Sequence, residues 1–279
     1  MKIKWKQDGN EKLQVNKDPD YGVEYLTYPA LEQTGLVRHG FSTRLGGVSK
    51  GYLSSMNLSF GRGDDPENVQ ENFRRFAHAI GVPYESIVLS DQTHTTSVRV
   101  VTAEDLGHGL TRKKEFFDVD GFVTNVPGVT LSTFFADCVP LYFVDPVHKA
   151  IGLSHSGWRG TADKMGKVTV ETMTARYGTS PSDVIAAIGP SICQDCYEVS
   201  EDVALRFPAE CLIAKGDGKY QLDLWLANRL VMLEAGVKAE NIHMPNLCTC
   251  CNPEYLYSHR ASNGKRGNLG AFLMLHEKL

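Results

Sequence analysis

Short runs of β-forming residues recur along most of the chain, and they limit its fold more than any other feature. Each run is rich in Val, Ile, Phe and Thr and is bounded by Gly, Pro, Asp or Asn, which is typical of strands. The runs read SIVLS, SVRVVT, DGFVTNV, VTLSTFF, PLYFVD, KAIGLSHS, DVIAAIG, EYLYSHR and LGAFLML. Because they outnumber the predicted helices and do not alternate with them one-to-one, a doubly wound parallel sheet is not expected.

Apolar spacing and end signals predict three helices between these runs. The first spans residues 66–80, with Asp65 as N-cap, Pro66 at the first helical position and Gly81 after the last turn. Its apolar stripe consists of Val69, Phe73, Phe76 and Ile80.

The other two helices follow later in the chain. The second is predicted over residues 161–177, ending at Gly178, and the third begins near Asp223. The third should present an apolar face made of Leu226, Leu230, Leu233 and Val237. Strands and helices together predict an α+β fold, a single domain with a substantial sheet core and helices on its outer faces.

Composition excludes several classes of protein. Of the 279 residues, 42% are hydrophobic and 22% are charged, which permits one large core. The formal net charge of −4 argues against general nucleic-acid binding, which needs a basic surface. No segment approaches the roughly 20 apolar residues of a membrane span, and the N-terminus lacks the apolar region of a signal peptide. With seven cysteines, an odd number, the chain is expected to be cytoplasmic.

One strand-like stretch carries polar residues where apolar ones are expected. Residues 134–144 read FFADCVPLYFV, with Asp137 and Cys138 in the middle and Pro140 directly after them. We interpret Pro140 as the point where regular pairing breaks. The break would turn Cys138 toward a site while Asp137 faces the reacting molecule.

Two histidines accompany this cysteine as candidate ligands. His94 in SDQTHTTS, Cys138 in FADCVP and His155 in LSHSGWRG each lie at or near the end of a predicted strand. The separations of 44 and 17 residues are too long for a compact zinc motif. Two imidazoles and one thiolate suit zinc or copper and leave a position for water or substrate.

Spacing alone leaves two other interpretations open. The histidines could be ordinary core residues and Cys138 a small buried hydrophobe, which spacing by itself favours. Alternatively, Cys138 could be the nucleophile of a metal-free cysteine hydrolase, with His155 or His94 as base and Asp137 as orienting group.

Several segments considered together resemble a known family. RHGFSTRLGGVS, DQTHTTSV, DGFVTN, FADCVPLYF, IGLSHSGWRGT, IGPSICQDCYEV, NLCTCCN and YSHR occur in this order from residue 38 to 260. This pattern resembles the YfiH/YlmD family, long labelled laccase-like multicopper polyphenol oxidases, and is most similar to its bacterial YlmD branch. The resemblance covers residues 31–279 as a catalytic domain and leaves residues 1–30 as an N-terminal extension of the same domain.

The resemblance implies layered β-sheets flanked by helices and a zinc site made by His94, Cys138 and His155. It also implies a purine nucleoside phosphorylase that acts on adenosine, inosine, guanosine and methylthioadenosine and deaminates adenosine. Purine nucleosides and phosphate are therefore the expected partners, and no oligomeric state is predicted. A copper-dependent phenol oxidase is an alternative, but a multicopper centre needs repeated HxH pairs, and the sequence has none.

Phosphorolysis needs a cationic or amide-rich pocket for phosphate. Arg44 is the leading candidate, because Gly46 and Gly47 beside it would let backbone N–H groups approach an anion. The further substrate-binding candidates lie in family-like segments and are Gln92, Arg159 and Arg260. For deamination, Asp137 is the only carboxylate placed in a motif, and we assign it the catalytic proton transfer.

Two features of the C-terminal half lack a clear role. Cys193 and Cys196 form a CxxC pair, and with Cys248, Cys250 and Cys251 they could build a structural zinc site or a redox pair. Buried free thiols are the favoured interpretation. Relatives commonly carry a Gly-Arg pair near the C-terminus, where this chain has Asn268 in place of the arginine and Arg266 two residues earlier.

Overall fold

The computed structural model describes residues 3–6 and 13–276, which form two large sheets stacked face to face. Sheet one has the strand order β1-β2-β3-β15-β7-β4. Its strands are β1 (Gln14–Lys17), β2 (Glu24–Thr27), β3 (Val37–Ser42), β15 (Leu269–Leu275), β7 (Thr130–Phe135) and β4 (Ile87–Leu89). All pairings are antiparallel except β4 with β7, which is parallel.

Sheet two has the order β14-β10-β8-β9-β6-β5. Its strands are β14 (Ile242–His243), β10 (Ile185–Ile188), β8 (Val139–Asp145), β9 (Ala150–Ser156), β6 (Gly121–Thr124) and β5 (Val98–Val100). A small third sheet, in the order β11-β13-β12, is built from β11 (Glu198–Ser200), β13 (Lys219–Leu222) and β12 (Leu212–Gly216).

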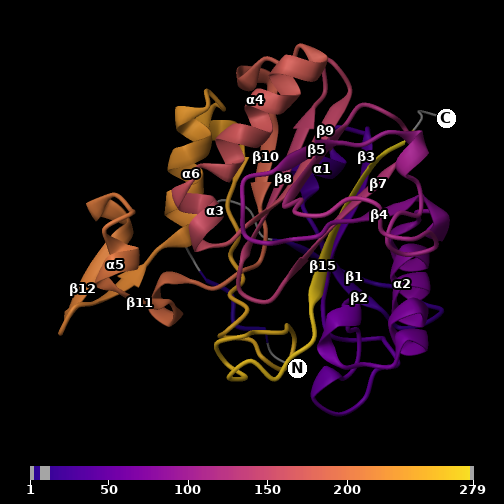
Figure 1. Cartoon of the computed structure of the whole chain (residues 1–279), viewed down its shortest axis with the longest axis horizontal. Helices are drawn as coiled ribbons and strands as arrows, with labels where there is room; N and C mark the ends of the chain where they lie inside the picture. The colour runs from indigo at the N-terminus through magenta and orange to yellow at the C-terminus, as the bar shows by residue number, and fades with distance from the viewer. Residues whose placement is uncertain (1–2, 7–12, 277–279) are drawn as a thin grey trace.

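Helices cover the outer faces of both large sheets (Figure 1). The described helices are α1 (Pro29–Glu32), α2 (Pro66–Ile80), α3 (Trp158–Ala162), α4 (Met165–Tyr177), α5 (Glu201–Ala204) and α6 (Leu224–Glu234). Of these, α1 adds Leu31 to the main core and α5 packs on the small third sheet. Helix α2 packs on sheet one, whereas α4 and α6 pack on sheet two. The layers are therefore helix, sheet, sheet and helix, which confirms the predicted α+β class with layered sheets at the core.

The main core fills the space between the two sheets. On β8, Tyr142 and Val144 point into this space, while Leu141 and Phe143 point to the helices. Strands buried on both faces need apolar residues at every position. This explains why the strand-like runs are continuous rather than alternating.

The first predicted helix is confirmed at both ends. The Asp65 side chain accepts a hydrogen bond of 2.9 Å from the Glu67 N–H, and Gly81 ends α2 in the left-handed conformation. All four residues of the predicted stripe are buried. Helix α2 therefore packs through the face that its sequence specifies.

The second and third helix predictions need correction. The second segment is two helices, because Lys164 between α3 and α4 adopts a left-handed φ of 63°. The third helix begins after Asp223 as predicted but ends at Glu234, so Val237 lies beyond it. Its fully buried residues are Leu224, Trp225, Ala227, Asn228, Val231 and Met232, and the predicted leucines are only partly buried.

Two strand interpretations were also wrong in part. Residues 254–260 form turns rather than a strand, although Tyr255, Leu256 and Tyr257 are buried in the main core. In the stretch 134–144, pairing breaks before Pro140 and not at it. Pro140 lies inside β8, opposite His155 of β9, and residues 136–138 form the loop between β7 and β8.

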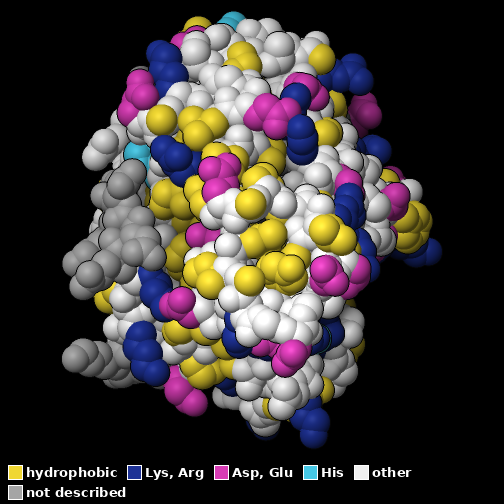
Figure 2. Space-filling view, turned by 90° about the vertical axis from the view of Figure 1, so that its left-hand side faces the viewer, with side chains coloured by type: hydrophobic (Ala, Val, Ile, Leu, Met, Phe, Trp, Pro, Cys, Tyr) yellow, Lys and Arg dark blue, Asp and Glu magenta, His cyan; other side chains and the backbone are white. Residues whose placement is uncertain are grey.

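The face of the molecule shown in Figure 2 carries both basic and acidic side chains, which are interspersed with apolar ones. This face is the left side of Figure 1, where α5, α6, β11 and β12 lie. Leu205 directly after α5 and Ile213 on β12 are 80% and 55% exposed. None of the described helices is both long enough and apolar enough to cross a membrane.

Candidate metal centre and active site

Three side chains that are distant in sequence meet at one end of the two stacked sheets. His94 lies in the loop after β4, Cys138 in the β7–β8 loop and His155 on β9. Their potential ligand atoms all lie within 4.8 Å of one another. The two imidazole rings meet edge to face, with 4.9 Å between centroids. The structure therefore brings together the three residues predicted as ligands.

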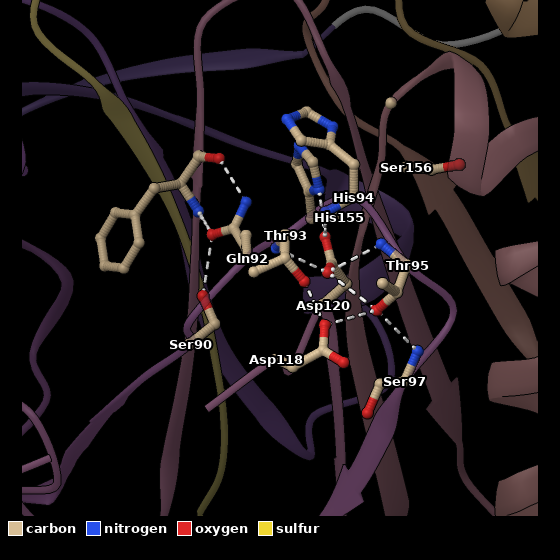
Figure 3. A network of polar contacts seen from close by, with 12 residues as sticks. Ser90, Gln92, Thr93, His94, Thr95, Ser97, Asp118, Asp120, His155 and Ser156 are labelled. Atoms are coloured by element: carbon tan, nitrogen blue, oxygen red, sulfur yellow. Dashed lines mark hydrogen bonds and ion pairs between the residues drawn. The ribbon is translucent and has the colours of Figure 1, made fainter. Parts of the chain in front are cut away.

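Asp120, at the start of β6, organises two of these ligands and was missed in the sequence. Its carboxylate lies 2.8 Å from His155 Nδ1 and accepts a backbone N–H bond of 3.2 Å from His94 (Figure 3). It also accepts hydrogen bonds from the backbone N–H groups of Thr93 and Thr95, with N–O distances of 2.9 and 3.0 Å. A carboxylate on Nδ1 leaves Nε2 of His155 free to bind a metal.

The electrostatics of the cluster favour a charged thiolate. Burial raises the pKa of the Cys138 thiol, but His155 and His94 outweigh burial and lower this pKa to about 6. Burial lowers the pKa of the His155 imidazole, but Cys138 and Asp120 outweigh it and raise the pKa to about 9. A thiolate is the form in which cysteine binds a metal or acts as a nucleophile.

Gly157, directly after β9, is required by the packing of the cluster. A Cβ at this position would lie 2.7 Å from His94 Nδ1 and 3.2 Å from Cys138 Sγ. Any side chain here would push the imidazole and the sulfur apart. The absence of a side chain therefore lets His94 and Cys138 approach each other.

This donor set fits a zinc ion, and copper is the alternative. Two imidazole nitrogens and one thiolate leave a fourth tetrahedral position open. Only two histidines meet in a ligand group with this cysteine within residues 3–6 and 13–276. Among the described residues, this cluster therefore offers a site for one metal ion and not the several linked copper sites of a multicopper oxidase.

A cavity of about 200 Å³ opens beside the three ligands and contains two arginines. Arg62 and Arg266 line it together with Ser90, Asp91, Gln92, Phe134, Phe135, Ala136 and Asn268. Burial and the charge of Arg62 lower the pKa of Arg266 to about 10, and the buried Nε of Arg266 has no hydrogen-bond partner within the described chain. The guanidinium groups of Arg62 and Arg266 can therefore bind an anion in this cavity.

Of two further cavities, one adjoins the first cavity and the other adjoins the cluster itself. One of about 620 Å³ shares Arg62, Gln92 and Phe134 with the first cavity and also includes the partly exposed Phe60. The other, of about 70 Å³, is lined by His94 and Cys138 together with Asp137, Trp158 and Arg159. The site is therefore accessible from a substantial cleft.

The glycine-rich segment predicted to bind phosphate lies away from this cleft. Arg44 Nε and Nη1 donate to the carbonyls of Ser54 and Pro253, at 2.9 and 2.7 Å, and its guanidinium covers Tyr257. A Cβ on Gly46 would lie 2.5 Å from the Val23 backbone, and one on Gly47 would lie 2.1 Å from the Ser55 carbonyl oxygen. Close backbone packing accounts for both glycines.

The remaining predicted substrate-binding residues lie at the edges of the site. Gln92 lines the first two cavities, but its amide exchanges hydrogen bonds with the Phe134 backbone. Arg159 lines the small cavity and stacks on Trp158. The guanidinium of Arg260 donates to the Cys196 and Glu198 carbonyls.

Asp137 is buried beside Cys138, but it faces the protein rather than the larger cavities. Its two carboxylate oxygens accept bonds of 2.6 Å from Thr249 Oγ1 and 2.7 Å from the Arg260 N–H. Its φ of 87° lies in the left-handed region, which is rare for residues other than glycine. These contacts hold the β7–β8 loop in the conformation that presents Cys138.

The same fold occurs in known proteins. A family model described as multi-copper polyphenol oxidoreductase laccase matches residues 38–276. The crystal structure of YlmD from Geobacillus stearothermophilus superposes with a TM-score of 0.88 at 35% identity, covering 96% of this chain and all of that one. The chain belongs to this family.

Curated relatives in this YfiH/YlmD family are enzymes with purine nucleosides as named substrates. "Purine nucleoside phosphorylase YlmD" of Bacillus subtilis is 37% identical over 245 residues, which are 85% of this chain and 88% of the relative. "Adenosine deaminase RL5" of an unknown prokaryotic organism is 34% identical, covering 79% of this chain and 87% of the relative. The copper in the family description and the names of these relatives thus refer to different chemistries.

Proposed function

We propose that this protein is a zinc-dependent purine nucleoside phosphorylase that also deaminates adenosine. Its proposed substrates are phosphate with adenosine, inosine, guanosine and methylthioadenosine. The observation that supports phosphorolysis best is that the cluster of His94, Cys138 and His155 shares one cavity with Arg62 and Arg266. The three ligands thus lie beside a pocket for an anion. This arrangement suits a reaction in which phosphate replaces the purine on the ribose.

Phosphorolysis exchanges one bond to the sugar for another. A phosphate oxygen bonds to C1′ of the ribose, the bond from C1′ to purine N9 breaks, and the departing purine takes up a proton. In our proposal Arg62 and Arg266 bind and orient the phosphate, because their guanidinium groups can hold two oxygens each. Phe134 and Phe60 supply apolar surface for the purine in the larger cavity.

His94, Cys138 and His155 would hold the zinc ion, with Asp120 fixing the ring orientation of His155. When bound, zinc supplies Lewis acidity that polarises a neighbouring oxygen or nitrogen. The protein itself contributes a preorganised set of donors, in which His155 is buried, Cys138 is partly buried and His94 is exposed. This arrangement requires no large rearrangement of the three side chains.

Deamination of adenosine would use the same cleft. Water adds to C6 of the purine and ammonia leaves, so that inosine is the product. Because both oxygens of Asp137 are hydrogen-bonded within the protein, we assign Asp137 the role of positioning Cys138. This assignment replaces the proton transfer expected from the sequence.

The polarised Cys138–His155 pair favours one second candidate, a metal-free cysteine hydrolase. The two candidates differ in their response to metal. Removal of zinc with a chelator should abolish the activity of a zinc-dependent phosphorylase. Addition of zinc should then restore this activity. A hydrolase that uses Cys138 directly should keep its activity without metal and lose it on thiol alkylation.

We also propose a reducing, cytoplasmic compartment for the enzyme, because an odd number of cysteines spread over a long chain fits such a compartment. The function is tested by incubating the zinc-loaded protein with each of the four nucleosides and phosphate and measuring free base by chromatography. Base release that His94→Ala eliminates supports the proposal. Absence of turnover of every nucleoside by protein with zinc bound would reject it.

A further inference from the structure

Four cysteines outside the active site converge from two loops. Cys193 and Cys196 lie between β10 and β11, and Cys248 and Cys251 lie between β14 and β15. Their four sulfur atoms are all within 4.8 Å of one another. Cys251 Sγ is 3.5 Å from Cys196 Sγ and 4.0 Å from Cys193 Sγ.

These distances match the geometry of a tetrahedral thiolate site. Zinc–sulfur bonds of about 2.3 Å place the sulfurs of a tetrahedron about 3.8 Å apart. We propose that these four cysteines, here called the four-thiol cluster, bind one zinc ion as a closed structural site. Four protein donors leave no position for substrate, which distinguishes this site from the His94–Cys138–His155 centre.

The sequence pattern and the backbone support this assignment. The two CxxC segments are the spacing that structural zinc sites use. The N–H groups of Cys193 and Cys251 both point at Cys248 Sγ, with N–S distances of 3.3 and 3.4 Å. Two converging donors stabilise negative charge on that sulfur.

The surroundings suit a buried ion with excess negative charge. Cys248 is completely buried and Cys193 is 4% exposed, within the apolar cluster that also contains Trp225. Lys6 lies near these thiols and forms an ion pair of 2.8 Å with Asp195, the residue before Cys196. Zinc with four thiolates carries two negative charges, and the charge of Lys6, which Asp195 shares, offsets them only in small part.

Binding at this cluster would fix the loops that hold the active-site cysteine. Ile192 donates its N–H to the Asp137 carbonyl, and Thr249 donates its hydroxyl to the Asp137 carboxylate. Each of these donors is adjacent in sequence to a cysteine of the cluster. A zinc ion joining the loops would therefore preserve the position of the β7–β8 loop, which carries Cys138.

The decisive experiment measures zinc in the full-length His94→Ala variant, which removes a ligand of the first site and leaves the four-thiol cluster intact. After zinc loading and dialysis, we expect about one zinc per chain, with X-ray absorption showing four sulfur neighbours at about 2.3 Å. Wild-type protein should hold about two. Cys196→Ser and Cys251→Ser should each lose one of these, whereas Cys250→Ser, in the same loop, should lose none.

Three results would overturn the proposal. The first is His94→Ala protein that retains no zinc while its cysteines are reduced. The second is bound zinc with nitrogen or oxygen neighbours in place of sulfur. The third is a Cys196–Cys251 disulfide found by mass spectrometry in protein purified without oxidation. None of these readouts depends on catalytic activity, so the proposal stands or falls separately from the proposed phosphorylase.

Discussion

The two cysteine-containing clusters of this molecule differ in donor chemistry and in access to solvent. The His94–Cys138–His155 cluster has three donors of mixed type and borders a cavity with two arginines. The four-thiol cluster has donors of one type and lies among apolar side chains. Three donors beside a cavity fit chemistry on a bound molecule, whereas four thiols, two of them buried and two partly exposed, fit stabilisation of loops.

The two clusters also rest on different supports. Asp120, directly before β6 of sheet two, orients His155 and the loop of His94. The four-thiol cluster instead joins the loops that follow β10 and β14, two short strands that pair in parallel. Ser191 and Cys248 form an isolated bridge between these loops. Strand β9 and the Asp120 hydrogen bonds thus support the proposed catalytic site, and metal–thiolate bonds would hold the loops beside it.

The largest expected effect separates the clusters by function. Cys138→Ser should reduce purine nucleoside phosphorolysis by at least about 1000-fold, because it removes a thiolate from the reaction centre. Its melting temperature should change little, since the sheets do not depend on this ligand. Steady-state kinetics and thermal unfolding check both statements, with Cys211→Ser as a buried-cysteine control that should keep activity.

The second effect is the reverse pattern at the four-thiol cluster. Cys196→Ser should lower the free energy of unfolding by roughly 3 kcal/mol and the melting temperature by about 6–12 °C. Activity measured well below the melting temperature should fall much less than in Cys138→Ser. Cys250→Ser is the control and should unfold at the wild-type temperature. If Cys196→Ser also unfolds at that temperature, the four-thiol cluster does not stabilise the fold in the way described above.

The third effect concerns the support of the catalytic cluster. Asp120→Asn should weaken zinc binding at the first site by about 10–100-fold, because the amide keeps the shape but loses the charge that orients His155. Competition with a chelating dye measures this affinity. The zinc of the four-thiol cluster should be unaffected, and equal weakening at both sites would show general disruption instead.

The smallest effect concerns phosphate. Arg266→Gln should raise the KM for phosphate by about 10-fold while changing the KM for the nucleoside little, since Arg62 remains in the cavity. Arg44→Gln is the matched control, because Arg44 lies outside the cavity. If Arg44→Gln raises the KM for phosphate more than Arg266→Gln does, phosphate binds at the glycine-rich segment and not in the cavity.

Parts of the fold followed directly from sequence. Caps at Asp65 and Gly81 define α2 because these signals are local. The broken second helix was missed, because a left-handed Lys164 has no sequence signal comparable to glycine. Residues 254–260 have the composition of a strand, but their apolar side chains fill the core from turns.

The candidate site was accessible from sequence only in part. Separations of 44 and 17 residues carry no spacing signal, so the ligand set depended on family resemblance. Asp120 and Arg62 gave no local signal, because an aspartate before a strand and an arginine in a turn are common. Both CxxC pairs were visible, but only the fold shows that their loops meet.

The most direct test of the proposed chemistry is phosphorus NMR of a reaction containing adenosine, phosphate and zinc-loaded protein. Our account predicts a ribose 1-phosphate signal that grows in step with free adenine and is absent with His94→Ala. Adenine released together with free ribose, with no phosphate incorporated, would contradict it.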